Sequence, residues 1–195
     1  MHIFFSIFGR DIPAYGLLIT VGTIIANVIG VVVLKKKNLD FYDFIMLEAY
    51  TLLGGIIGAK ALFFIVSRNQ IDWSRLLEPR YLNMLLSSGF VFYGGLIGGI
   101  ATLLLGGKIQ KINIEEYVIN SIFLVPFIHS FGRIGCFMAG CCYGIPYEGF
   151  GAVVFPETSV GLSGVSLFPI QLVEAAFLMI ISCILLLIQL KYKSR

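Results

Sequence analysis

The amino-acid sequence predicts an all-α integral membrane protein with about five transmembrane helices. Hydrophobic residues make up 58% of the 195-residue chain and charged residues only 13%, whereas a soluble domain carries roughly 25% charged residues. The mean hydropathy is +0.93. Five apolar runs are long enough to cross a membrane, which takes about 20 helical residues for a ~30 Å hydrocarbon core. These runs lie near 12–34, 44–66, 89–107, 114–131 and 168–190.

The segments between the runs differ in character. Residues 67–88 carry a tryptophan and several arginines, which favour the membrane–water interface, so we expect a short amphipathic helix on the membrane surface. Residues 132–167 are rich in glycine and include Pro146 and Pro156. We expect an ordered loop there, with a short strand near Ala152–Phe155. The whole chain, 1–195, is predicted to form a single membrane domain.

Basic residues predict the orientation of the helices. Positively charged residues in short loops mark the cytoplasmic side of a membrane protein. Lysines follow the first, third and fifth runs, and the opposite side carries arginines but no lysine. The residues on the lysine side are Lys35, Lys36, Lys37, Lys108, Lys111, Lys191, Lys193 and Arg195. We therefore expect the N-terminus outside, the C-terminus in the cytoplasm and the 132–167 loop on the extracytoplasmic side.

Seven polar side chains fall at a similar depth in this topology, near the outer ends of the runs. They are Tyr15, Lys60, Tyr93, His129, Arg133, Gln171 and Glu174. Ionisable groups at membrane depth are costly and usually face the protein interior, so we expect one shared site open to the outer leaflet. A guanidinium can bind a phosphate through two hydrogen bonds, which makes Arg133 a candidate ligand for a phospholipid headgroup.

Several of these residues can also have purely structural roles that involve no ligand. Polar side chains near helix ends can reach the interface without any ligand. Glu174 can serve as the counter-ion of Arg133 or of Lys60, and Gln171 can cap a helix that starts near Pro169. Glycines at 94, 95, 98 and 99, and at 54, 55 and 58, favour close helix packing, and they are also compatible with a groove for lipid tails.

Three of the four cysteines lie close together, as Cys136, Cys141 and Cys142. A disulfide of Cys136 with Cys141 or Cys142 suits an oxidising compartment. A thiolate activated by Arg133 and His129 would be a nucleophile, and simple packing of small apolar side chains is the remaining interpretation. Only His129 is near enough in sequence to add a metal ligand, so we expect no metal site.

Five segments of the chain carry recognisable motifs, at residues 12–17, 53–59, 92–98, 132–137 and 168–175. In this order, they resemble the prolipoprotein diacylglyceryl transferase family of bacterial membrane enzymes. The family signature Gly-Arg-Ile/Leu-Gly-Asn-Phe is similar to residues 132–137, with Cys136 in place of asparagine. Tyr93 stands at the position of a family histidine that is implicated as a base, and Cys141 stands at a signature glutamate.

The resemblance implies transfer of a diacylglyceryl group from phosphatidylglycerol to an acceptor thiol, at the outer face of the bacterial plasma membrane. Expected partners are phospholipid, a lipoprotein precursor or another thiol acceptor, and membrane lipids, with no nucleic acid and no cofactor. The expected catalytic residues are Arg133, His129, Tyr93, Cys136, Cys141 and Cys142. The expected substrate-binding residues are Tyr15, Lys60, Gly94, Gly95, Gln171 and Glu174. Two alternatives are a non-catalytic or thiol-active phospholipid-binding relative and a membrane thiol–disulfide protein.

Overall fold

The computed structural model describes residues 4–7, 10–87, 89–156, 162 and 164–191. Within these residues, four helices are long and apolar enough to cross a membrane, and a bent pair gives a fifth span if it is counted as one. The four are α1 (Ala14–Lys36), α2 (Phe41–Val66), α4 (Phe92–Gln110) and α7 (Ile170–Lys191), and the pair is α5 (Ile114–Ser121) with α6 (Leu124–Ala139). The predicted class, an all-α integral membrane protein with about five spans, is confirmed.

Large apolar side chains point outward along these helices. Ile24, Ile57, Ile97 and Ile180 are each more than half exposed. An aqueous surface rarely carries apolar area on this scale, so lipid chains are the solvent for these faces. The chain divides into two compact units, residues 1–39 with 118–195 and residues 40–117. The single membrane domain expected over 1–195 stays a prediction.

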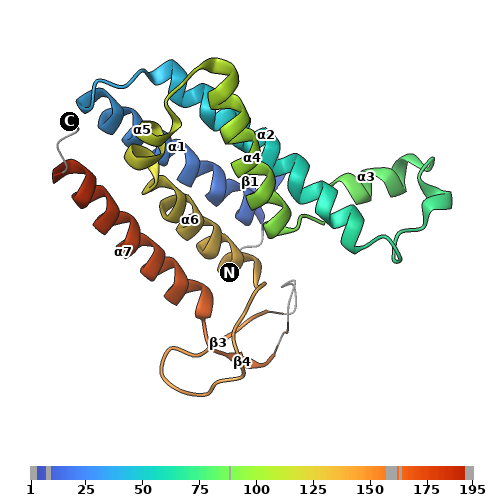
Figure 1. The fold of residues 1–195 in the computed structure, drawn as a ribbon. Helices are drawn as coiled ribbons and strands as arrows, with labels where there is room; N and C mark the ends of the chain where they lie inside the picture. Colours follow the sequence, from blue (N-terminus) through green and yellow to red (C-terminus); the bar gives the residue numbers. More distant parts are fainter. Residues whose placement is uncertain (1–3, 8–9, 88, 157–161, 163, 192–195) are drawn as a thin grey trace. The chain divides into compact units, whose positions relative to one another are not determined.

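In the first unit, α6 packs against both α1 and α7, and Figure 1 shows α7 running alongside α6. Small residues bring α1 close to α6. The ring of Phe131 lies directly over Gly22, where an added Cβ would come within 2.6 Å of it, and Gly135 faces the backbone of Tyr15. Because Gly135 has no side chain, the start of α1 rests directly on the last turns of α6.

The span predicted near 114–131 is broken and longer in the structure. Helices α5 and α6 meet at a 47° bend. Pro126 explains the break, because it has no N–H to donate to the Ile122 carbonyl four residues earlier. That carbonyl accepts from Val125 instead, at 3.2 Å. Helix α6 then continues to Ala139, so residues 132–139, which were expected in the loop, are helical.

Among the residues that the structure describes, two short antiparallel strand pairs lie outside the helices. Strand β3 (Val153–Val154) pairs with β4 (Ser166–Leu167), which confirms the strand expected near Ala152–Phe155. Residues 157–161 and 163 of the same segment lie outside the described residues. Strand β1 (Phe4–Ile7) pairs with β2 (Arg10–Pro13), directly before α1. The sequence analysis did not predict this hairpin.

In the second unit, α2 and α4 pack backbone to backbone through their glycines. A Cβ added at Gly58 would overlap the Gly94 carbonyl oxygen, and one added at Gly54 would overlap Thr102 and the Gly98 carbonyl oxygen. The pairs 58–94 and 54–98 run in opposite directions along the chain, so the two helices are antiparallel. Small side chains at such an interface allow the close approach that holds membrane helices together.

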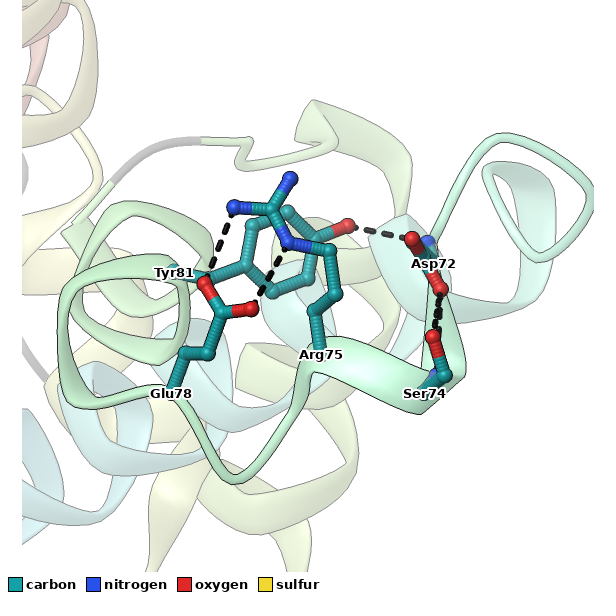
Figure 2. A network of polar contacts seen from close by, with 5 residues as sticks. All are labelled: Asp72, Ser74, Arg75, Glu78 and Tyr81. Atoms are coloured by element: carbon teal, nitrogen blue, oxygen red, sulfur yellow. Dashed lines mark hydrogen bonds and ion pairs between the residues drawn. The ribbon is translucent and has the colours of Figure 1, made fainter.

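The connection between α2 and α4 contains a 3₁₀ turn, η1 (Trp73–Arg75), and the helix α3 (Pro79–Ser87). Figure 2 shows the polar network that shapes it. Ser74 donates from its backbone N–H and its hydroxyl to Asp72, and Arg75 forms a two-point contact with Glu78. These hydrogen bonds lower the pKa of Asp72 and of Glu78. The expected short helix is confirmed, and its position on the membrane surface stays a prediction.

A matched pair of glycine substitutions tests the α2–α4 interface. Gly58→Ala would force its methyl group against the Gly94 carbonyl, and overpacking of this kind costs about 1–3 kcal/mol. Gly55→Ala meets only the Gly95 carbonyl oxygen at 3.6 Å, so it gains helix propensity without a clash. Thermal unfolding in detergent should show a lower Tm for Gly58→Ala only. Equal Tm values for the two variants would contradict the packing.

Candidate functional site

An ion pair joins α6 to α7. The Arg133 Nε lies against the Glu174 carboxylate, with the arginine side chain 16% exposed and the glutamate side chain 45% exposed. The sequence left Arg133 and Lys60 as possible partners of Glu174, and the structure pairs it with Arg133. A guanidinium has five N–H donors, and one carboxylate uses at most two of them. The pair therefore orients Arg133 while leaving it able to bind a second anion.

Glu174 of this ion pair also lines an apolar groove of about 310 Å³. Its lining residues are His129, Glu174, Phe177, Leu178 and Ile181. The α7 residues among them are spaced at i, i+3, i+4 and i+7, which places them on one helix face. The groove is charged at its Glu174 end and apolar toward Ile181. An amphiphile with a polar head and a hydrocarbon tail matches this distribution.

The end of α6 turns back on itself and brings the three cysteines together. Gly140 adopts a left-handed conformation with φ +68°, the Cys141 N–H donates to the Cys136 carbonyl at 3.0 Å, and the Gly140 N–H donates to the Phe137 carbonyl at 3.2 Å. These two bonds define a Schellman motif. As a result, the Sγ atoms of Cys136, Cys141 and Cys142 all lie within 4.8 Å of one another, as free thiols.

Gln171 ties this turn to the first turn of α7. Its side chain is fully buried, and its Nε2 donates to the Cys141 carbonyl oxygen at 2.8 Å. Within the described residues, its Oε1 is buried without a hydrogen-bond partner. From its position after Pro169, Gln171 was a candidate cap for its own helix. The structure shows instead that its side chain bonds to a loop 30 residues away.

Tyr15 completes the cluster of predicted residues in this unit. It lies near the start of α1, and its hydroxyl is within electrostatic range of Arg133 and all three cysteines. Among these cysteines, Cys141 lies beyond the end of α6. The pKa of Cys141 is raised, mainly because the thiol is partly buried and secondly because Cys142 lies beside it. A protonated thiol is a poor nucleophile, so this environment disfavours Cys141 as the attacking group.

The other predicted residues belong to the second unit. Lys60 donates to the carbonyl oxygens of Leu85 and Gly89 at 2.6 and 3.3 Å, and its Nζ lies 4.4 Å from the centre of the Phe90 ring. These contacts hold the chain between α3 and α4. Tyr93 lies in the first turn of α4 and is 69% exposed, next to the packed Gly94 and Gly95. A single site that joins both units stays a prediction.

Sequence reasoning missed the apolar wall of the groove. Phe177, Leu178 and Ile181 lie in an unbroken hydrophobic run, where nothing in the composition distinguishes them from lipid-facing residues. Their spacing from Glu174 was the available signal. Counting helical positions from an ionisable residue in a span would have identified the same face.

Fold and site together define an α-helical multi-pass membrane protein with an arginine–glutamate pair at the end of an apolar groove. Residues 2–195 match the family model described as prolipoprotein diacylglyceryl transferase. The chain belongs to this family, as its motifs predicted.

Several named relatives are bacterial phosphatidylglycerol–prolipoprotein diacylglyceryl transferases. The protein from Clostridium tetani is 32% identical over 176 residues, which cover 90% of this chain and 68% of the relative. The second such transferase of Clostridium perfringens is 31% identical, with 88% and 66% covered. The protein from Clostridioides difficile is 28% identical, with 88% and 64% covered. The chain thus spans about two thirds of the length of these relatives.

Removal of the Gln171 hydrogen bond should loosen the cysteine turn. Gln171→Leu keeps a buried side chain of similar length but leaves the Cys141 carbonyl without its donor, which costs about 1 kcal/mol. We expect a lower Tm and faster alkylation of Cys141 by a maleimide. Gln110→Leu is the control, because the Gln110 side chain makes an exposed bond with Tyr50. Unchanged alkylation of Cys141 would contradict this role.

Proposed function

We propose that the protein transfers a diacylglyceryl group from phosphatidylglycerol to the thiol of a lipoprotein precursor. The observation that supports this most directly is the Arg133–Glu174 pair at the charged end of the apolar groove. The names of the relatives supply the two substrates. An acyl chain suits the face formed by Phe177, Leu178 and Ile181, with the phosphate placed at Arg133.

The proposed reaction exchanges one bond for another at the glyceryl carbon. The acceptor sulfur forms a new C–S bond, and the C–O bond to the phosphate breaks, so that glycerol phosphate leaves. Negative charge accumulates on the departing phosphate oxygen. Arg133 stabilises this charge, since a positioned cation in a site that excludes water is more effective than one in solution.

His129 is the proposed base in this unit. Its imidazole lines the groove together with Glu174 and lies one helical turn before Arg133 on α6. It can accept the proton of the acceptor thiol, whose thiolate is the attacking form. Tyr93 is the alternative predicted from the sequence, and it lies in the other unit.

The proposed location is the bacterial plasma membrane, with the site facing outside. The distribution of lysines supports this orientation, although Lys193 and Arg195 lie outside the described residues. Under this topology, the end of α6 and the cysteine turn lie at the outer surface, where a secreted lipoprotein precursor arrives.

Substitution of Arg133 tests the mechanism. Arg133→Ala removes the phosphate ligand, and Arg133→Lys keeps the charge but loses the planar two-point geometry. In cells that lack the transferase, we expect lipid attachment to a reporter lipoprotein to fall by about 10²-fold or more for Arg133→Ala, and less for Arg133→Lys. Arg75→Ala, which removes an exposed arginine in the α2–α4 connection, is the control and should retain activity.

Two outcomes would contradict this proposal. If the unsubstituted protein attaches no lipid, the transferase activity is excluded. If that protein also co-purifies with intact phosphatidylglycerol, it is a lipid-binding relative without turnover. If Arg133→Ala retains full activity at equal protein level, Arg133 does not bind the leaving group.

Thiol labelling tests the orientation. Cys142 is exposed, beyond the end of α6, so a membrane-impermeant maleimide should label it in intact cells that have been treated with a membrane-impermeant chelator and reductant. Labelling is read after purification, by mass spectrometry of the peptides that contain Cys142 and Cys183. Cys183 lies within the α7 span and should stay unlabelled. Labelling of Cys142 only after the cells are permeabilised would reverse the assigned topology.

A further inference from the structure

The three cysteines at the end of α6 have no role in the proposed transfer. The acceptor thiol comes from the lipoprotein precursor, the phosphate is held by Arg133, and the base is a histidine. Even so, Cys136, Cys141 and Cys142 converge, with all three Sγ atoms within 4.8 Å of one another. They are the only group of three or more potential metal-ligating side chains found among the described residues.

The spacing of the three sulfur atoms suits a metal ion. A zinc–sulfur bond is about 2.3 Å long, so three thiolates around one ion lie about 3.8–4.0 Å apart in tetrahedral or trigonal geometry. The observed limit of 4.8 Å exceeds this by about 0.8–1.0 Å, so small side-chain rotations suffice. Sequence spacing alone argued against a metal because only His129 is near enough to add a ligand, but three convergent thiols already form most of a site.

The backbone holds the thiols in place independently of any ion. Cys136 projects from the last full turn of α6, and the Schellman motif folds Cys141 back toward it. Cys142 adopts a left-handed conformation with φ +57°, which is uncommon for a residue with a side chain. The hydrogen bond from Gln171 to the Cys141 carbonyl fixes the same turn from α7.

Burial and charge also suit a bound cation. Cys136 is buried, Cys141 intermediate and Cys142 exposed, so the cluster has a closed floor and one open side through which an ion can enter and a water or fourth ligand can bind. Three thiolates around a divalent ion leave a net charge of −1. Arg133 lies one helical turn before Cys136 and within its electrostatic range, where its positive charge, shared with Glu174, offsets part of that excess.

We propose that Cys136, Cys141 and Cys142 form a binding site for one soft d¹⁰ metal ion, Zn²⁺ or Cu⁺, through three thiolates. Thiolates are the side-chain ligands that select such ions over Mg²⁺ or Ca²⁺. Binding replaces the three thiol protons, which pass to solvent, and involves no change of oxidation state. The bound ion cross-links the end of α6 to the turn that Gln171 anchors. This proposal does not depend on the transferase activity.

Metal titration of the full chain tests the site. Protein purified in detergent, reduced, freed of metal and kept from air is titrated with Cd²⁺, which reports thiolate coordination by ultraviolet charge-transfer absorption. We expect one ion per chain, displacement of Cd²⁺ by Cu⁺ or by a large excess of Zn²⁺, and protection of three thiols from alkylation. Comparison of the two competitors identifies the preferred ion, and a large excess of Mg²⁺ should displace nothing.

Single serine substitutions assign the ligands. Cys136→Ser, Cys141→Ser and Cys142→Ser should each weaken Cd²⁺ binding by more than about 100-fold, because even outer-shell partners of a metal are worth 10–100-fold in affinity. Cys183→Ser, on the exposed surface of α7, should leave binding unchanged. Size-exclusion profiles verify that each variant folds, and the alkylation pattern of the unsubstituted protein tests the site without any substitution.

Three results would overturn the proposal. The first is Cd²⁺ binding at less than one ion per chain, or without charge-transfer absorption. The second is equal affinity in the unsubstituted protein and a folded Cys136→Ser variant. The third is a disulfide between two of the three cysteines in protein prepared without exposure to air, since such a bond removes two of the ligands.

Discussion

Side chains on one face of α7 form hydrogen bonds and an ion pair with polar groups of the neighbouring segments. The packing of the first unit depends on these interactions. Gln171 bonds to the Cys141 carbonyl, Glu174 to Arg133, Ser182 to the Phe123 carbonyl and Gln189 to the Ile119 carbonyl. In lipid, a backbone group without a partner costs several kcal/mol. Helix α6 can therefore begin at a break and end in a turn only because α7 supplies donors at both places.

The same arrangement explains the position of the groove. Arg133 is largely buried and needs a counter-charge, which Glu174 provides from the beginning of α7. Below that pair, α7 turns apolar side chains toward His129. The groove is thus a direct consequence of one amphipathic stripe, whose polar positions hold the helices together and whose apolar positions leave room for a hydrocarbon chain.

The sequence was sufficient to predict the membrane spans, which depend on the length of the apolar runs. It was insufficient to predict the features that depend on single hydrogen bonds. Five long apolar runs predicted the spans, because a membrane sets a minimum helix length. The bend at Pro126 and the extension of α6 to Ala139 were missed, although proline within a helical run was a visible signal. Ser182 and Gln189 were also missed, because their partners are backbone carbonyls that become available only at the break. The sequence shows that Ser182 and Gln189 share a helix face with Gln171. It does not show that their side chains bond to backbone carbonyls of neighbouring helices.

The cysteine turn carries side chains whose chemistry differs from that of the family signature. In the family signature, asparagine and glutamate stand where this chain has Cys136 and Cys141. Those side chains form strong hydrogen bonds and bind hard metal ions through oxygen. Thiols form only weak hydrogen bonds, but as thiolates they bind soft metal ions strongly. Gly140 allows the turn whichever side chains flank it. The exchange therefore supplies two of the three convergent sulfur atoms near Arg133, at positions where the signature has hydrogen-bonding side chains.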